Sequence, residues 1–157
     1  VLEILSLSSV QELAGDKEWI QLDQVLEQIL DQYKVLAQSR SLTIDNQIPA
    51  KPVYMDPAIL KLVLSNVISN AVKHSDAGGE IQLRLEEEGT HLAVENTSQE
   101  MVETAEMPMT ASRQKKEGGL GLFVVQHLLD HEELAYQFDK TAMGLRFRME
   151  LPKAPQE

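Results

Sequence analysis

Apolar residues recur every three or four positions in three parts of the chain, and this spacing predicts three helices. The first covers residues 22–37. The second begins after Asp56, because a carboxylate followed by proline suits the N-cap and the first position of a helix. It runs to about Ser75. The third begins near Leu120, after a cluster of glycines, and is apolar enough to be buried.

Other segments alternate apolar and polar residues, which is typical of strands. A short strand-like piece, "WIQ", precedes the first helix, and "SLTIDNQIP" reads as a strand that ends at Pro49 and Pro52. "EIQLRLEEEG" and "THLAVEN" are expected to pair through a turn at Gly89, and "LAYQFD" and "GLRFRMELP" close the chain. This order predicts an α/β two-layer sandwich, with one mixed, mostly antiparallel sheet covered on one face by about three helices.

Three segments lie outside this pattern. Residues 97–118 lack periodicity, are partly basic, and are long for a loop in a compact domain, so the segment is expected to be functional or mobile. Residues 1–13 are apolar-rich and are interpreted as the tail of a preceding helix or a linker. Residues 14–153 form the predicted domain, and residues 154–157 form a tail. Because the chain begins with Val1, we expect it to be a piece of a longer protein.

Composition excludes several classes of function. The chain has 157 residues, 43% of them hydrophobic, which is enough for one domain with a core. No apolar run approaches the roughly 20 residues that a membrane span needs. The absence of cysteine excludes disulfides and thiolate metal sites. A net charge of -11 argues against nucleic acid or anionic lipid as partners, and an anionic nucleotide would need local compensation.

The segment "LSNVISNAVKHS" in the second helix carries a polar stripe beside a broad apolar face. Asn66 and Asn70 are one turn apart, followed by Lys73 and His74. A carboxamide oxygen suits Mg²⁺, which bridges phosphate oxygens with few protein ligands, and a lysine adds charge for phosphate. Alternatively, the two amides cap neighbouring strands or face water, the lysine is solvated, and His74 is an edge histidine with an ordinary partner.

The glycine cluster before the third helix indicates an anion site. Gly118, Gly119 and Gly121 allow the backbone to approach a ligand, and a helix that begins near Leu120 points its free N–H groups there. Basic side chains lie just upstream at Arg113, Lys115 and Lys116. The alternative is a glycine hinge before a core helix. No Gly-Lys-Ser/Thr follows, so a P-loop enzyme is disfavoured.

Taken together, these motifs resemble a known family from about Gln21 to Pro152. "DPAILKLVLSNVISNAVKHS" resembles the N box of sensor histidine kinases, "GGLGLFVVQHLL" resembles their G2 box, and "GLRFRMELP" resembles their closing strand. The chain is therefore similar to the catalytic ATP-binding domain of these kinases, whose Bergerat-type fold is shared with gyrase, Hsp90 and MutL. The resemblance implies ATP and Mg²⁺ as cofactors.

The resemblance also implies roles for individual residues. Asn70 would ligate Mg²⁺, Asn66 would lie near the phosphates, Lys73 would contact a phosphate, and His74 would lie near the nucleotide. Gly119 and Gly121 would line the phosphate path, and Leu122 would pack near the base.

Three departures from the family pattern concern the same site. Asn96 stands where the G1 box has an aspartate that accepts from the adenine amine, and Ser98 stands where it has a glycine. Because an asparagine oxygen can still accept, adenine selectivity is expected to survive with weaker binding. The F box is absent, with Met107 and Met109 in its place, and Glu117 replaces the first G2 glycine. These departures leave slow turnover or a weak nucleotide site open.

The implied reaction is transfer of the ATP γ-phosphoryl group to a histidine on an upstream helical hairpin. Gyrase-like relatives activate water with a glutamate where this chain has Asn66, a poor general base, so efficient ATP hydrolysis is not expected. None of the four histidines has the acceptor motif. The chain alone is therefore expected to bind nucleotide without phosphorylating itself and to be a monomer.

The family further implies a homodimer in the full-length protein, a response regulator as partner, and a cytoplasmic domain of a membrane-anchored sensor, with no direct membrane contact by this domain. Two alternatives stay open. One is a degenerate nucleotide-binding regulatory module without transfer activity, and the other is a serine kinase of the anti-sigma type.

Overall fold

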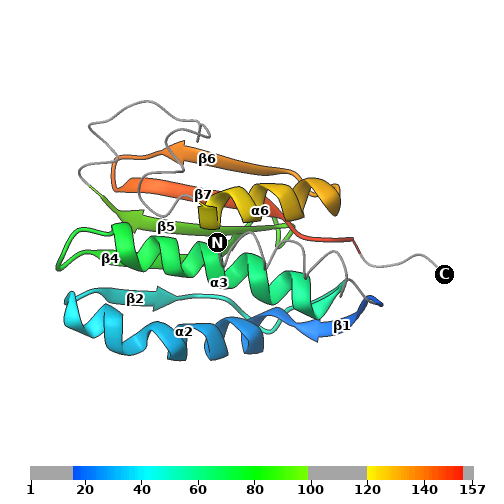
Figure 1. Cartoon of the computed structure of the whole chain (residues 1–157), viewed down its shortest axis with the longest axis horizontal. Helices are drawn as coiled ribbons and strands as arrows, with labels where there is room; N and C mark the ends of the chain where they lie inside the picture. Colours follow the sequence, from blue (N-terminus) through cyan, green and yellow to red (C-terminus); the bar gives the residue numbers. More distant parts are fainter. Residues whose placement is uncertain (1–15, 99–119, 154–157) are drawn as a thin grey trace.

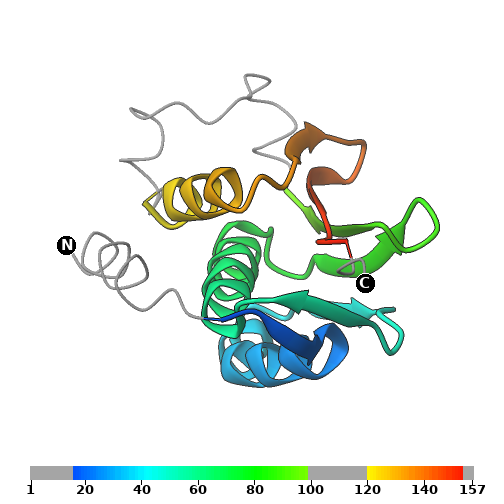
Figure 2. The ribbon, with the colours of Figure 1, turned by 90° about the vertical axis from the view of Figure 1, so that its right-hand side faces the viewer.

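The computed structural model describes residues 16–98 and 120–153, in which a sheet of five strands carries helices on one of its faces (Figures 1 and 2). The sheet order is β2-β4-β5-β7-β6, with β2 parallel to β4 and the other neighbours antiparallel. The three helices lie side by side over the sheet, and α3 packs between α2 and α6. The predicted two-layer sandwich is confirmed. The elements of this part are α2 (Leu22–Ser39), β2 (Thr43–Asn46), α3 (Pro57–His74), β4 (Glu80–Glu86), β5 (His91–Thr97), α6 (Leu120–His131), β6 (Tyr136–Lys140) and β7 (Gly144–Glu150).

The sequence predicted one sheet, whereas the part of the chain that the structure describes has two. A second, two-stranded sheet joins β1 (Glu18–Gln21) to β3 (Pro52–Met55) in antiparallel register. Pro52 was expected to end a strand, yet it begins β3. Proline is tolerated at the first residue of a strand and at a sheet edge, because its missing N–H is not needed there. The small sheet thus joins the chain segment before α2 to the segment after β2.

Local signals place α3, the central helix. The Asp56 side chain accepts a hydrogen bond from the Ala58 N–H at 2.8 Å, and proline occupies the first turn, as predicted. The helix ends at His74, and the N–H of the following Ser75 still donates to the Ala71 carbonyl at 3.1 Å. The hairpin between β4 and β5 also turns at Gly89, whose φ of 89° favours glycine.

The core lies between the helices and the sheet. Eight residues of α3 are buried, and Leu64 is fully inaccessible to solvent. Burying one such leucine stabilises the fold by about 1.5–3 kcal/mol. From the sheet, Leu92 and Val94 of β5 and Phe147 of β7 meet this helix face. Because α3 is apolar on most of its surface, it is held in place between its neighbours, and so are its few polar side chains.

The face of the sheet opposite the helices carries paired charges. Arg84 on β4 forms ion pairs with Glu86 at 2.9 Å and with Glu95 on β5 at 3.0 Å. Arg146 on β7 pairs with Asp139 on β6 at 3.0 Å. Burial alone would lower the pKa of Arg84, but its hydrogen bonds to the two glutamates raise it above its ordinary value. This face is therefore charged and internally paired, whereas the helix face is apolar. None of the helices within the described ranges combines the length and apolar character that crossing a bilayer would need.

Candidate functional site

A pocket lies between the sheet and the helices α3 and α6. It is open on one side, and its space amounts to about 270 Å³ when the solvent at the opening is included. Three consecutive strands of the sheet, β5, β7 and β6, contribute to its wall. Its lining residues are Val67, Asn70, Ala71, Val94, Asn96, Leu122, Phe138, Leu145 and Phe147.

Strand alternation explains why Asn96 faces this pocket. Side chains of a strand point to opposite faces in turn, so Asn96 shares the helix face with Val94, whereas Glu95 between them points outward and pairs with Arg84. Asn96 is only 4% exposed. A polar side chain is thus placed in a wall that is formed mostly by hydrocarbon and aromatic groups.

The helix supplies a second carboxamide to the same pocket. Asn70 lies one turn from the end of α3 and lines the pocket beside Val67 and Ala71. Within residues 16–98 and 120–153, the carboxamides of Asn70 and Asn96 form no hydrogen bond with another protein group. Asn96 is buried and Asn70 is half-buried, and a carboxamide in such a position usually has a hydrogen-bond partner. These two amides can therefore bind a ligand without first breaking a protein contact.

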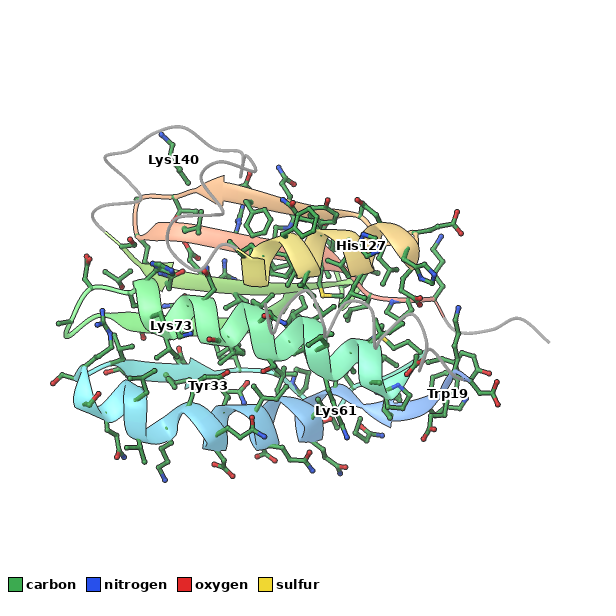
Figure 3. All side chains as sticks on the ribbon, in the orientation of Figure 1. Trp19, Tyr33, Lys61, Lys73, His127 and Lys140 are labelled. Atoms are coloured by element: carbon green, nitrogen blue, oxygen red, sulfur yellow. The ribbon has the colours of Figure 1, made fainter. Side chains whose placement is uncertain are left out.

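Of the predicted stripe of polar residues on α3, only Asn70 lines the pocket. The Asn66 Nδ2 donates to the Leu62 carbonyl at 2.7 Å, one turn back in the same helix. Lys73 is exposed and His74 is half-buried, both near the C-terminal end of α3, where Figure 3 labels Lys73. Among the described residues, Asn66, Lys73 and His74 lie outside the pocket lining, although Lys73 follows Asn70 by less than one turn.

The glycine motif is described only in part. Leu120 and Gly121 form the start of α6, and Leu122, which is buried, lines the pocket. Ser98, two positions after Asn96, is 1% exposed, and its N–H donates to the Met143 carbonyl at 3.2 Å. The other predicted positions lie outside the described residues: Met107, Met109, Arg113, Lys115, Lys116, Glu117, Gly118 and Gly119.

The aromatic part of the wall was not singled out from the sequence. Phe138 on β6 and Phe147 on β7 are directly paired across the strands, with ring centroids 5.1 Å apart and planes tilted by 49°. Together with Leu145, they cover the sheet side of the pocket. The sequence did carry one signal for these residues. Leu145 and Phe147 are two positions apart, and this spacing places both side chains on the same face of a strand. What remained hidden was that β7 lies next to β5.

Gly144 brings these two strands together. A methyl group added to it would lie 2.3 Å from the Asn96 carbonyl oxygen and 2.4 Å from the Ser98 nitrogen. Only glycine therefore permits this approach of β7 to β5. Within the described part of the chain, no group of three or more His, Cys, Asp or Glu side chains is arranged to hold a metal ion.

Comparison with known proteins identifies the family. Residues 55–155 match the family described as "Histidine kinase-, DNA gyrase B-, and HSP90-like ATPase". The chain is 32% identical to the sensor histidine protein kinase HK06 of Streptococcus pneumoniae. The match covers 95% of this chain and 35% of that protein. It is 29% identical to the sensor protein VanSB of Enterococcus faecalis, over 97% of this chain and 36% of that protein.

The chain thus spans about a third of the length of these relatives. Among solved structures, the catalytic domain of the histidine kinase ThkA in a nucleotide-free form has the same fold. Its TM-score is 0.71 at 18% identity, over 90% of this chain and all of that one. The resemblance found in the N box, the G2 box and the closing strand is confirmed. The chain belongs to the family of histidine kinase-, DNA gyrase B- and HSP90-like ATPases, and it corresponds to the catalytic domain of its sensor histidine kinase relatives.

Proposed function

We propose that this domain binds Mg²⁺–ATP in the pocket between α3, α6 and the sheet, and that it presents the γ-phosphoryl group to a histidine elsewhere in the full-length protein. One observation carries the proposal. Asn70 and Asn96, which come from a helix and a strand separated by the whole of β4, line one pocket with carboxamides that no described protein group engages.

The pocket lining suits the base of a nucleotide. Apolar and aromatic side chains, including Phe138 and Phe147, offer surfaces for the faces of a flat ring. The Asn96 carboxamide offers hydrogen bonds to its polar edge. Leu122 closes the wall from α6. These residues would hold the base by burial and fix its orientation with a single polar group.

The phosphates would lie toward the end of α3 and the start of α6. The Asn70 oxygen would ligate Mg²⁺, which needs only one or two protein ligands when phosphates supply the others. A bound Mg²⁺ would supply positive charge that offsets the charge of the phosphates. The N–H groups at the start of α6 favour an anion there. We propose that Lys73 adds positive charge and that Asn66 and His74 lie near the phosphates, as the family resemblance implies.

Transfer to an external histidine fits the residues better than hydrolysis. Asn66 lacks the basicity needed to activate water. The four histidines of the chain belong to folded elements: His74 in α3, His91 in β5, and His127 and His131 in α6. The His91 Nδ1 lies 2.8 Å from the Thr90 hydroxyl, and the His131 Nδ1 lies 3.1 Å from a Glu132 carboxylate oxygen.

The wider context is proposed from the relatives. An acceptor histidine would lie on a helical hairpin of the same protein that also forms a homodimer, and the phosphoryl group would pass to a response regulator. Residues 1–13 would link to that hairpin, residues 14–153 would form the catalytic domain, and residues 154–157 would be a tail. The domain would work on the cytoplasmic side of a membrane-anchored sensor.

Thermal unfolding with and without nucleotide tests the binding step. Mg²⁺–ATP at about 100 times its dissociation constant should stabilise the native state by about 2.7 kcal/mol. The shift should need Mg²⁺ and should disappear in Asn70→Ala. Asn46→Ala is the matched control, because Asn46 is an exposed asparagine on β2. No shift with several millimolar Mg²⁺–ATP, or an equal loss in both variants, would overturn the proposal.

The transfer step is tested in the full-length protein with labelled ATP. We expect acid-labile, base-stable phosphate, as on a histidine, and no label in the Asn70→Ala variant. Nucleotide binding without transfer would favour the degenerate regulatory module. Acid-stable phosphoserine would favour the serine kinase.

A further inference from the structure

Asn96 is the most deeply buried polar side chain among the residues that line the pocket. It is 4% exposed and lies on β5, between Ile81 of β4 and Leu145 of β7 in the strand register. Apart from the two asparagines, all described lining residues are apolar, so the described wall carries no charge. Any side-chain hydrogen bond from this described wall to the edge of a buried base must therefore come from a neutral carboxamide.

A carboxamide differs from a carboxylate in what it can recognise. It has an oxygen that accepts and an NH₂ group that donates, whereas an ionised carboxylate only accepts. At its six-position edge, adenine presents an amine donor beside a ring nitrogen acceptor. Guanine presents the reverse pattern, a carbonyl acceptor beside an N–H donor. A carboxamide can pair with either edge, because a half-turn of its terminal group exchanges its oxygen and its nitrogen.

Whether one orientation is fixed depends on protein partners. Asn66 shows a fixed case, because its Nδ2 is held by the Leu62 carbonyl at 2.7 Å. Within the described ranges, no protein group holds the carboxamide of Asn96 in this way. Terminal torsions of asparagine have broad preferences, so turning this group costs little. The ligand itself would then select the orientation.

We propose that Asn96 makes the pocket selective for purines rather than for adenine, so that guanine nucleotides bind within about tenfold of adenine nucleotides. This differs from the expectation that adenine selectivity survives the loss of the aspartate. The inference rests on the proposed nucleotide-binding function, because it assigns the base-reading group of that same site.

Calorimetric titration with Mg²⁺–ATP and Mg²⁺–GTP tests the proposal. For the wild-type chain, the ratio of the GTP to the ATP dissociation constant should stay below about ten. Asn96→Asp should raise this ratio by at least about tenfold, because a carboxylate still accepts from the adenine amine but repels the guanine carbonyl. Asn46→Asp makes the same chemical change at an exposed position of β2 and should leave the ratio unchanged.

The outcomes separate the two proposals. If ATP binds but GTP binds more than about a hundredfold more weakly, this inference is wrong and the proposed function stands. An unchanged ratio in Asn96→Asp would also overturn the inference. Failure of both nucleotides to bind would overturn the proposed function as well.

A second variant keeps the test decisive if Asn96→Asp does not fold. Asn96→Leu has a similar size and no hydrogen-bonding group. Loss of the carboxamide should weaken ATP and GTP by similar factors and leave their ratio within about threefold, because both bases lose the same group. A loss confined to ATP would show that the carboxamide has one fixed orientation and would overturn the inference.

Discussion

Gly144 is the residue at which a single added methyl group should separate two strands of the sheet. It faces Thr97 in the β5–β7 register, next to the pair formed by Leu145 and Asn96. In Gly144→Ala, the new carbon would lie 2.3 Å from the Asn96 carbonyl oxygen, where ordinary van der Waals contact begins at 3.4 Å. Because the obstructing atoms are backbone, no side chain can move aside, and the strands must separate by about 1 Å.

The expected loss of stability follows from this displacement. Overpacking in a tight region costs about 1–3 kcal/mol. The hydrogen bond from the Ser98 N–H to the Met143 carbonyl, already 3.2 Å long, would pass beyond bonding distance and add about 1 kcal/mol. Gly144→Ala should therefore lower the free energy of unfolding by about 2–4 kcal/mol. Since the Asn96 backbone moves, nucleotide affinity should also fall.

Urea unfolding measures this loss. With a slope of about 2 kcal/mol per molar, the midpoint should fall by roughly 1–2 M. Gly78→Ala is the matched control. Gly78 has a φ of 80° and no atom within 4 Å of an added methyl, so backbone strain alone should cost about 1–2 kcal/mol and leave nucleotide affinity unchanged. A loss below about 1 kcal/mol in Gly144→Ala, with affinity intact, would refute the steric explanation.

Three further outcomes are expected, two of them read from urea unfolding at neutral pH. Leu64→Ala in the core should lower the free energy of unfolding by about 2–5 kcal/mol, whereas Leu36→Ala, at a position 38% exposed, should lower it by under about 1 kcal/mol. Similar losses in the two variants would contradict the burial of Leu64. Asp56→Ala should cost about 1 kcal/mol through loss of the α3 cap, and Asp56→Asn, which can still cap, should cost less; equal losses would argue against capping. Burial, aided by the charge of Asp130, raises the pKa of Tyr136 above its ordinary value of 10.0. Above pH 10 the phenol of the unfolded state ionises while that of the folded state stays protonated, so the free energy of unfolding falls as the pH rises. In alkaline unfolding measurements, Tyr136→Phe should therefore lose stability less steeply with pH than the wild-type chain. Parallel curves for the two proteins would contradict this explanation.

Local chemistry made several elements readable from the sequence. The start of α3 was predictable because Asp56 and the proline after it act within one turn. The turn at Gly89 was predictable because its positive φ suits glycine. By contrast, the pairing of β1 with β3 joins segments about 30 residues apart, and no local signal announces which strand is the partner. For this reason, Pro52 was predicted to end a strand, whereas it begins β3.

The candidate site shows the same division. Spacing alone placed Asn66 and Asn70 on one stripe of α3, because both lie a turn apart on one helix. Only the packed structure separates them, with Asn70 in the pocket wall and Asn66 bonded to its own helix. The sequence itself determined which residues could supply carboxamides, caps and turns, since those properties belong to single residues and their near neighbours. The tertiary structure decided that Asn70 meets Asn96 beside Phe147, because this depends on strand order and helix packing, which bring together groups that are distant along the chain.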